Sequence, residues 1–197
     1  MKKVILVGTL AAAMAVPAFA AGQKGKKTVK PMSDQTFVIG AAKGGLAEVE
    51  LGKLAQEKAA STEVKNFGKR MVDDHGKAND ELQSLARNKN ITLPADLDAK
   101  DKAVRDRLSK LSGAAFDRAY MNAMVTDHRK DASEFKREST AGMDPDVKAF
   151  ASKTLPTVEE HLKLAQDTTK AVGTTGTKPA KTVGTTGTKP AKKGYGK

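Results

Sequence analysis

The chain has 197 residues, a formal net charge of +12 and no cysteine. Without cysteine it can have neither a disulfide framework nor a lipoprotein attachment site. It also lacks a Ser/His/Asp signature and a phosphate-binding loop, so we expect a binding or interaction protein rather than an enzyme.

Residues 1–20 have the pattern of a secretory signal. Two lysines precede an apolar stretch over 4–16, which is too short for a retained membrane span. Pro17 then breaks the helix, and Ala20 ends a small-residue cleavage site. We therefore expect cleavage near Ala20 and a periplasmic or secreted mature chain without a transmembrane span.

Positive charge is concentrated in two segments on either side of the central region. A basic linker over 21–32 carries four lysines and no acidic residue, and 170–197 carries seven lysines and no acidic residue. The region between these segments has a formal charge of −1. The basic character of the chain therefore belongs to its ends.

Between 33 and 169 the apolar residues recur at helical spacing. Ser33 and Ser61 are the expected N-caps of the first two helices, and Asp144 followed by Pro145 marks the clearest helix start. The predicted helices cover about 34–60, 62–88, 101–111, 114–139 and 145–169. Helices of about 26 residues would be roughly 39 Å long, which is typical of a four-helix bundle. The sequence therefore predicts an all-α fold, an up-down four-helix bundle over 33–169 with a short extra helix between the second and third long helices.

The C-terminal segment 170–197 contains two copies of an eleven-residue unit made largely of Gly, Thr, Lys and Pro. Such a sequence cannot bury enough apolar surface to become ordered, so we expect a disordered tail. As a solvated polycation, the tail can bind an anionic envelope surface of lipid headgroups or lipopolysaccharide, or it can serve only as a solubilising extension. Interleaved aromatic residues are missing, so no specific nucleic-acid binding is expected.

All three histidines of the chain fall on the apolar faces of predicted helices. His75, His128 and His161 lie on the second, third and fourth long helices. Glu48 lies at the centre of the buried face of the first. Counted from the connecting turns, Glu48 and His75 are nearly level, whereas His161 is about five residues out of level with His128, or roughly 7 Å. Glu48, His75 and His128 therefore form the better-supported cluster.

Two interpretations of this cluster remain open. In the first, Glu48 accepts hydrogen bonds from histidine, and the polar network fixes the register of the bundle without a ligand. In the second, the imidazoles and the carboxylate bind a transition-metal ion such as Fe, Zn, Mn or Cu. Asp74, Asp127 and Asp131 would then be further ligands or would orient the imidazoles. For Asp74 and Asp127 the alternative, which we favour, is a surface salt bridge with a neighbouring Arg or Lys.

A variant of the metal interpretation uses the methionines one turn before two of the histidines. Met71 lies four residues before His75, and Met124 has the same spacing to the next histidine along the chain. Thioether together with imidazole suits Cu(I), although methionine at such spacing is also a common core residue. The two segments resemble each other at a separation of 53 residues, so we interpret the two helical hairpins as products of a duplication.

Four stretches of the helical region carry a family resemblance: FVIGAAKGGLAEVELGKLA over 37–55, VKNF with the MVDDH that ends at His75, FDRAY with the MVTDH that ends at His128, and DPDVKAF from Asp144 with His161. Together they resemble Domain of Unknown Function 4142 over 33–169. The resemblance implies a ferritin-like bundle that is bacterial, exported and located in the cell envelope, and it implies no established activity. Valine stands three residues before each histidine, so the Glu-x-x-His motif of di-iron proteins is absent and we do not expect ferroxidase or oxygenase chemistry.

Overall fold

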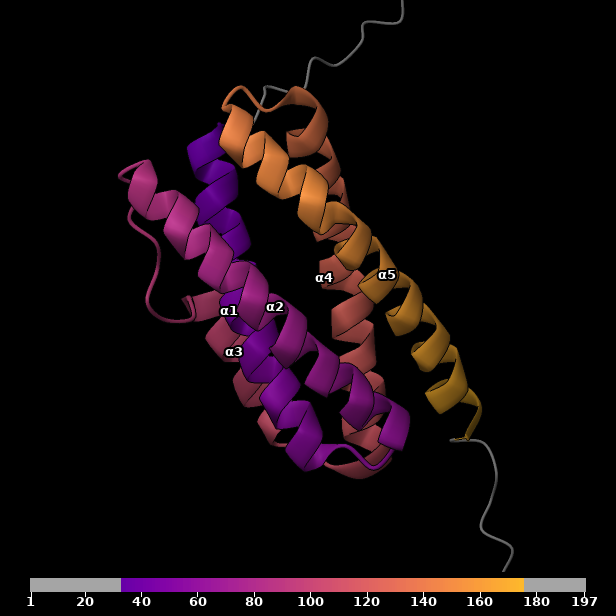
Figure 1. The fold of residues 1–197 in the computed structure, drawn as a ribbon. Coiled ribbons are helices and arrows are strands. Elements are labelled where there is room, and N and C mark those ends of the chain that lie inside the picture. The colour runs from indigo at the N-terminus through magenta and orange to yellow at the C-terminus, as the bar shows by residue number, and fades with distance from the viewer. Residues whose placement is uncertain (1–32, 176–197) are drawn as a thin grey trace, which may run out of the picture. The chain divides into compact units, whose positions relative to one another are not determined.

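The computed structural model describes residues 33–175, and these form five α-helices and no strand (Figure 1). α1 spans Asp34–Lys58, α2 Thr62–Asn88, α3 Ala99–Ser109, α4 Gly113–Ala141 and α5 Pro145–Thr175. The predicted all-α bundle is confirmed, including the short helix between the second and third long helices. The predicted signal peptide, the basic linker up to residue 32 and tail residues 176–197 lie outside the described residues.

The starts of three long helices are fixed by the capping residues that the sequence indicates. Ser33 and Ser61 each accept a hydrogen bond from the backbone N–H three residues later, at 3.2 and 3.4 Å. Asp144 caps α5 in the same way at 3.1 Å. These bonds satisfy backbone donors that have no partner inside the helix, and so they set where each helix begins.

The last helix is longer than predicted. α5 is helical through Pro156 and ends at Thr175, past the predicted end near Thr169. The first six residues assigned to the tail, 170–175, are therefore helical. Val172 explains the extension, because its side chain is buried in the apolar core.

Two helical hairpins make up the bundle. α1 packs along α2, and α4 packs along α5, with three-residue turns at 59–61 and 142–144. The connection between the hairpins, residues 89–112, contains α3 and returns from the end of α2 to the start of α4 (Figure 1). As a result α2 and α4 run in the same direction, whereas the two helices of each hairpin are antiparallel. The alternating up-down order predicted for the four long helices is therefore wrong, because the connection 89–112 crosses the full length of the bundle.

Two aspartates join the hairpins at their turns. Asp117, near the start of α4, accepts hydrogen bonds from two backbone N–H groups of the turn 59–61, at 3.0 and 2.9 Å. Asp34, at the start of α1, accepts two from the turn 142–144, at 3.1 and 2.7 Å. The aspartates are 83 residues apart, and the same separation relates the N-caps Ser61 and Asp144. Each hairpin therefore holds the turn of the other in an equivalent way.

This equivalence corrects the 53-residue duplication that the sequence suggests. A shift of 53 residues pairs α2 with α4, which are the second helix of one hairpin and the first helix of the other. A shift of 83 residues pairs corresponding helices instead, and it relates Phe67 to Phe150 and Glu48 to Asp131. The likeness of the two histidine segments thus does not come from corresponding helices.

The buried core consists of two apolar clusters separated by a polar layer. One cluster lies towards the turn 59–61 and includes Leu51, Phe67 and Tyr120. The other lies towards the turn 142–144 and includes Phe37 and Phe135, whose rings meet edge to face at 4.9 Å. In each long helix, one buried polar residue occupies the interval between the clusters.

Close backbone contact between α1 and α2 positions this layer. A Cβ atom on Gly52 would lie only 2.6 Å from the carbonyl oxygen of Gly68, so the helices approach to a distance that only glycine allows. Gly52 is one turn from Glu48, and the contact therefore fixes the polar face of α1 against α2. None of the helices in the described region is long and apolar enough to cross a membrane.

Candidate metal centre

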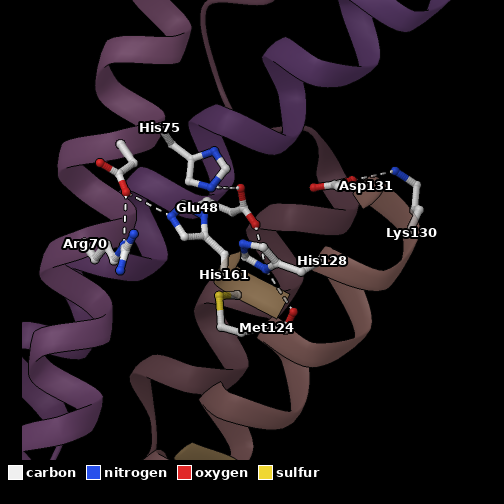
Figure 2. A network of polar contacts seen from close by, with 9 residues as sticks. Glu48, Arg70, His75, Met124, His128, Lys130, Asp131 and His161 are labelled. Atoms are coloured by element: carbon white, nitrogen blue, oxygen red, sulfur yellow. Dashed lines mark hydrogen bonds and ion pairs between the residues drawn. The ribbon is translucent and has the colours of Figure 1, made fainter. Parts of the chain in front are cut away.

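Each of the four long helices contributes one residue to the polar layer (Figure 2). Glu48 comes from α1, His75 from α2, His128 from α4 and His161 from α5. Their relative exposures lie between 0 and 9 %. The four candidate ligands predicted from the sequence thus meet in one buried site.

The three imidazoles form a nearly regular triangle. The ring centres of His75 and His161 are 5.2 Å apart, those of His128 and His161 5.4 Å, and those of His75 and His128 5.8 Å. One ring nitrogen from each residue lies within 4.8 Å of the other two. Nitrogens around a tetrahedral zinc ion lie about 3.3 Å apart, so small side-chain movements would bring the triangle to the size that an ion requires.

His161 belongs to this triangle, and the offset expected from counting residues is wrong. The Cα–Cβ bond of a helical residue tilts towards the N-terminus of its helix. The tilt moves the His128 ring away from the turn 142–144 and the His161 ring towards it, because α4 runs into that turn and α5 runs out of it. Residue counting along the backbone ignores this tilt and so overestimates the offset.

Glu48 faces two of the imidazoles. Its Oε2 lies 2.8 Å from His75 Nε2, and its Oε1 lies 3.2 Å from His128 Nδ1. Both are ion-pair distances, but neither contact has the direction of a well-formed hydrogen bond. Five buried atoms of the layer consequently lack a hydrogen-bond partner among the described residues: Glu48 Oε1 and Oε2, His75 Nε2, His128 Nε2 and His161 Nδ1.

Neighbouring groups orient two of the imidazoles. His128 Nδ1 lies 2.9 Å from the carbonyl oxygen of Met124, so in the tautomer that fits this contact Nδ1 donates and Nε2 has the lone pair. His161 Nε2 lies 2.9 Å from Asp74 Oδ2, which leaves the lone pair on Nδ1. Both of these lone pairs belong to nitrogens that have no hydrogen-bond partner in the part of the chain that the structure describes. This is the arrangement in which metal-binding histidines are held in proteins.

Asp74 therefore orients His161, and it also forms the predicted salt bridge with a neighbouring arginine, Arg70. Arg70 Nε donates to Asp74 Oδ2 at 3.2 Å, and a second guanidinium nitrogen lies 2.8 Å from Glu160. Sequence reasoning did not identify Arg70 as that partner. The available signal was its spacing of four residues before Asp74, which places the two side chains on one helix face.

Burial and the charges of neighbouring groups shift the pKa values of the site residues in opposite directions. Burial tends to raise the pKa of Glu48, but the charges of His128 and His75 outweigh it and hold that pKa at about 2. Burial tends to lower the pKa of His75, but the Glu48 carboxylate outweighs it and raises that pKa. Burial lowers the pKa of His161 to about 4 despite its bond to Asp74. Near neutral pH, Glu48 is therefore ionised and His161 is neutral.

Asp127 and Asp131 lie outside the triangle of imidazoles. With Glu48 they line a pocket of about 200 Å³ between α1, the start of α3 and α4, which we call the α1–α4 pocket. Burial and the charge of Glu48 raise the pKa of Asp131 to about 7, and the same two causes raise the pKa of Asp127. Among the described residues, the group of atoms close enough to share one ion contains the three imidazoles alone, so Asp127 and Asp131 lie outside it, as does Glu48.

The methionines proposed for Cu(I) are buried in the apolar cluster that borders the site. Met71 and Met124 both have 0 % exposure and pack with Leu51, Phe67 and Tyr120. Their surroundings are those of core residues. The imidazoles and the carboxylate are therefore the groups from which the candidate metal centre is built.

Comparison with known proteins gives a family and a fold. A family model described as a domain of unknown function (DUF4142) matches residues 18–168. The crystal structure of a DUF305 protein from Streptomyces coelicolor, assigned as secreted, is similar with a TM-score of 0.62 and 15% sequence identity. The similarity covers 72% of this chain and 93% of that chain, and at this identity it shows the fold alone. No curated protein matches the chain.

Proposed function

The chain belongs to the DUF4142 family, whose description assigns no activity, and on that premise we propose that it binds one transition-metal ion between its four long helices. The ligands are the imidazoles of His75, His128 and His161 and the carboxylate of Glu48. Four protein ligands complete a tetrahedral shell and leave no open position for a substrate. We therefore propose a non-enzymatic protein that holds a metal.

The observation that carries this proposal is the set of buried atoms without a hydrogen-bond partner in the described structure, above all His128 Nε2 and His161 Nδ1, which have neither a hydrogen bond nor an ion pair there. Leaving a buried polar group unsatisfied costs about 1–3 kcal/mol, and more when the group is charged. A self-sufficient polar network would use these atoms in well-directed bonds with one another. A cation among them would satisfy all of the groups at once, which favours the metal interpretation over a purely structural core.

The donor set narrows the choice of metal. Imidazole nitrogen suits Zn, Cu, Fe and Ni, whereas Mn and Mg prefer oxygen ligands. Three imidazoles and one carboxylate therefore favour Zn²⁺ or Cu²⁺ over Mn²⁺. Affinity within the first-row series also peaks at Cu²⁺.

We further propose that the chain is exported and that its bundle is related to ferritin-like folds. The predicted signal over 1–20 and the assignment of the DUF305 neighbour as secreted support a location outside the cytoplasm. A bundle with one long crossover has the connectivity of ferritin-like folds, and the segment 89–112 supports that relationship.

Metal content and thermal stability of the mature chain test the proposal. After loading with Zn²⁺ or Cu²⁺, we expect about one ion per chain and a Tm that falls when a chelator removes it, because a ligand that binds the folded state stabilises it. The double variant His75→Ala/His128→Ala should bind no ion and should lose the chelator effect. The variant Lys65→Ala/Arg129→Ala changes exposed positions of the same helices and should behave as wild type.

The same measurements can also contradict the proposed metal site. If the wild type binds no ion and its Tm ignores the chelator, the proposal is wrong and the polar layer is structural. The histidine variant would then be destabilised only through its lost contacts.

A second proposal concerns the lysine-rich end of the chain, which we propose binds anionic envelope surfaces. Six of its seven lysines lie beyond Thr175, where α5 ends. Deleting 176–197 therefore leaves the helix intact and removes most of the charge. We expect the deletion to abolish salt-sensitive binding to vesicles of anionic phospholipid, and unchanged binding would contradict the proposal.

A further inference from the structure

The α1–α4 pocket leads from solvent to Glu48, and we propose that it receives a hydrated divalent cation and passes it to the imidazoles. This inference rests on the proposed function, because it assigns a route to the same site. The pocket has a volume of about 200 Å³, enough for an ion with several waters. Its walls are α1 on one side and α4 on the other, with the residues around the start of α3 at its rim.

Glu48 is the point at which the pocket and the metal centre meet. Its side chain is 2% exposed, its two oxygens have no hydrogen-bond partner within 33–175, and it lines the pocket. The same carboxylate lies 2.8 Å from His75. An ion that reaches the inner wall of the pocket therefore meets a metal ligand directly.

The carboxylates of the pocket are deeper than its lysines. Asp131 has 16% side-chain exposure, against 55% for Lys130, whose ammonium group lies 3.5 Å away. Lys130 also pairs with Glu134 at 3.1 Å, and Lys43 pairs with Asp98 at 3.7 Å. The lysines are thus partly neutralised at the rim.

Two further carboxylates of the pocket are available to attract a cation. In the structure as described, Asp101 and Asp127 form no ion pair, although Lys100 also lines the pocket from an exposed position. With Asp131 and Glu48 they make four carboxyl groups that line the pocket between its rim and the metal centre. Figure 2 shows Asp131 on the side of Glu48 away from Arg70.

Glycines keep the pocket open. Gly40 and Gly44 line it from α1, and a Cβ on Gly40 would meet no atom within 4 Å. A Cβ on Gly44 would lie 3.7 Å from Asp131 Oδ2, at ordinary contact distance across the pocket. A larger side chain at this position would therefore fill the pocket without striking the backbone.

The second hollow that reaches Glu48 is too small for the same role. It has a volume of about 20 Å³ and is lined by His75, Asn79 and Leu82 among others. A space of this size holds about one water molecule. A hydrated ion therefore fits the α1–α4 pocket and does not fit the second hollow.

The test compares rates of Zn²⁺ uptake, followed by the loss of Zn²⁺ from a chromogenic chelator. Gly44→Leu should slow both uptake and release on the order of ten-fold, because binding then requires the pocket to rearrange. Stoichiometry and equilibrium affinity should stay at the wild-type values. Gly44→Ala should have a small effect. Gly76→Leu, a helix glycine with open space around it and outside the pocket, should match wild type.

A charge variant covers the case in which Gly44→Leu does not fold. Asp101→Asn/Asp127→Asn should slow uptake and weaken its dependence on salt, because the carboxylates attract the ion. If wild type binds Zn²⁺ but a folded Gly44→Leu, or the aspartate variant, loads at the wild-type rate, the route is wrong while the proposed function stands. If wild type binds no Zn²⁺ at all, both are overturned.

Discussion

The carboxylate oxygen Oε2 of Glu48 lies 2.8 Å from Nε2 of His75, and both side chains are buried in the bundle. His75 also contributes one of the three ring nitrogens that lie within 4.8 Å of one another. Without a metal, a proton on Nε2 of His75 is stabilised by the negative charge of Glu48. We expect a bound ion to take the place of that proton.

Metal binding should therefore release a proton from His75. Glu48 raises the pKa of His75 above its usual 6.5, so below this raised pKa the residue is protonated and must lose a proton to coordinate. Glu48, with a pKa of about 2, and His161, with a pKa of about 4, do not titrate near neutral pH. Affinity should thus rise with pH and level off once His75 is neutral. Calorimetry in buffers of different ionisation enthalpy should show about one proton released at pH 6 and fewer at pH 9. Release that does not change with pH would contradict this exchange.

The Asp74 carboxylate should matter for affinity and not for stoichiometry. It fixes the His161 ring by accepting its Nε2 proton, and it touches no other imidazole. Groups that orient a metal-binding histidine contribute about 10–100-fold to affinity. We expect Asp74→Asn to weaken Zn²⁺ binding by this factor while still binding one ion per chain, measured by competition with a chelator. Asp73→Asn, on an exposed residue that pairs with Lys69 and lies outside the site, is the control and should bind as wild type does. Equal affinities for the two variants would show that Asp74 does not position His161.

The contact between α1 and α2 should make two glycines of the bundle respond in opposite ways to the same substitution. A Cβ on Gly52 would lie 2.6 Å from Gly68 O, so Gly52→Ala must separate the helices and should destabilise the fold by about 1–3 kcal/mol. Gly76 has open space around it, so Gly76→Ala should stabilise the helix by up to about 1 kcal/mol. Chemical denaturation of the metal-free chain measures both. Similar effects for the two variants would contradict the close approach of these helices.

The sequence predicted the features that depend on local chemistry. Ser33, Ser61 and Asp144 are N-caps, because a short polar side chain before an apolar helical pattern meets the first backbone donors. The burial of Glu48 and His75 followed from their positions on apolar helix faces.

Features that depend on three-dimensional packing could not be read in the same way. The height of the His161 ring along the bundle, relative to that of His128, depends on how side chains tilt on two antiparallel helices. The role of Asp74 depends on how α2 lies against α5, which brings together residues 87 positions apart. The same direction of α2 and α4 depends on where the crossover containing α3 ends. The spacing of apolar residues along a single helix carries no information on any of these three features.

Glu138 provides a test of the fold that is independent of the metal. It lies near the turn 142–144, where burial and a shared hydrogen bond with Asp34 raise its pKa to about 7 from the usual 4.5. A carboxyl with a raised pKa binds its proton more tightly in the folded state, so it supports stability at low pH and its contribution is lost as pH rises from about 4.5 to 7.

Glutamine at position 138 keeps a donor for Asp34 and cannot ionise. Glu138→Gln should therefore have a Tm close to wild type at pH 5 and a higher Tm at pH 8, at about 3 to 4 °C per kcal/mol in a domain of this size. Glu134→Gln, on a carboxylate paired with Lys130 at 3.1 Å, should show no such gain. A difference between Glu138→Gln and wild type that is the same at both pH values would mean that Glu138 is not protonated in the folded chain.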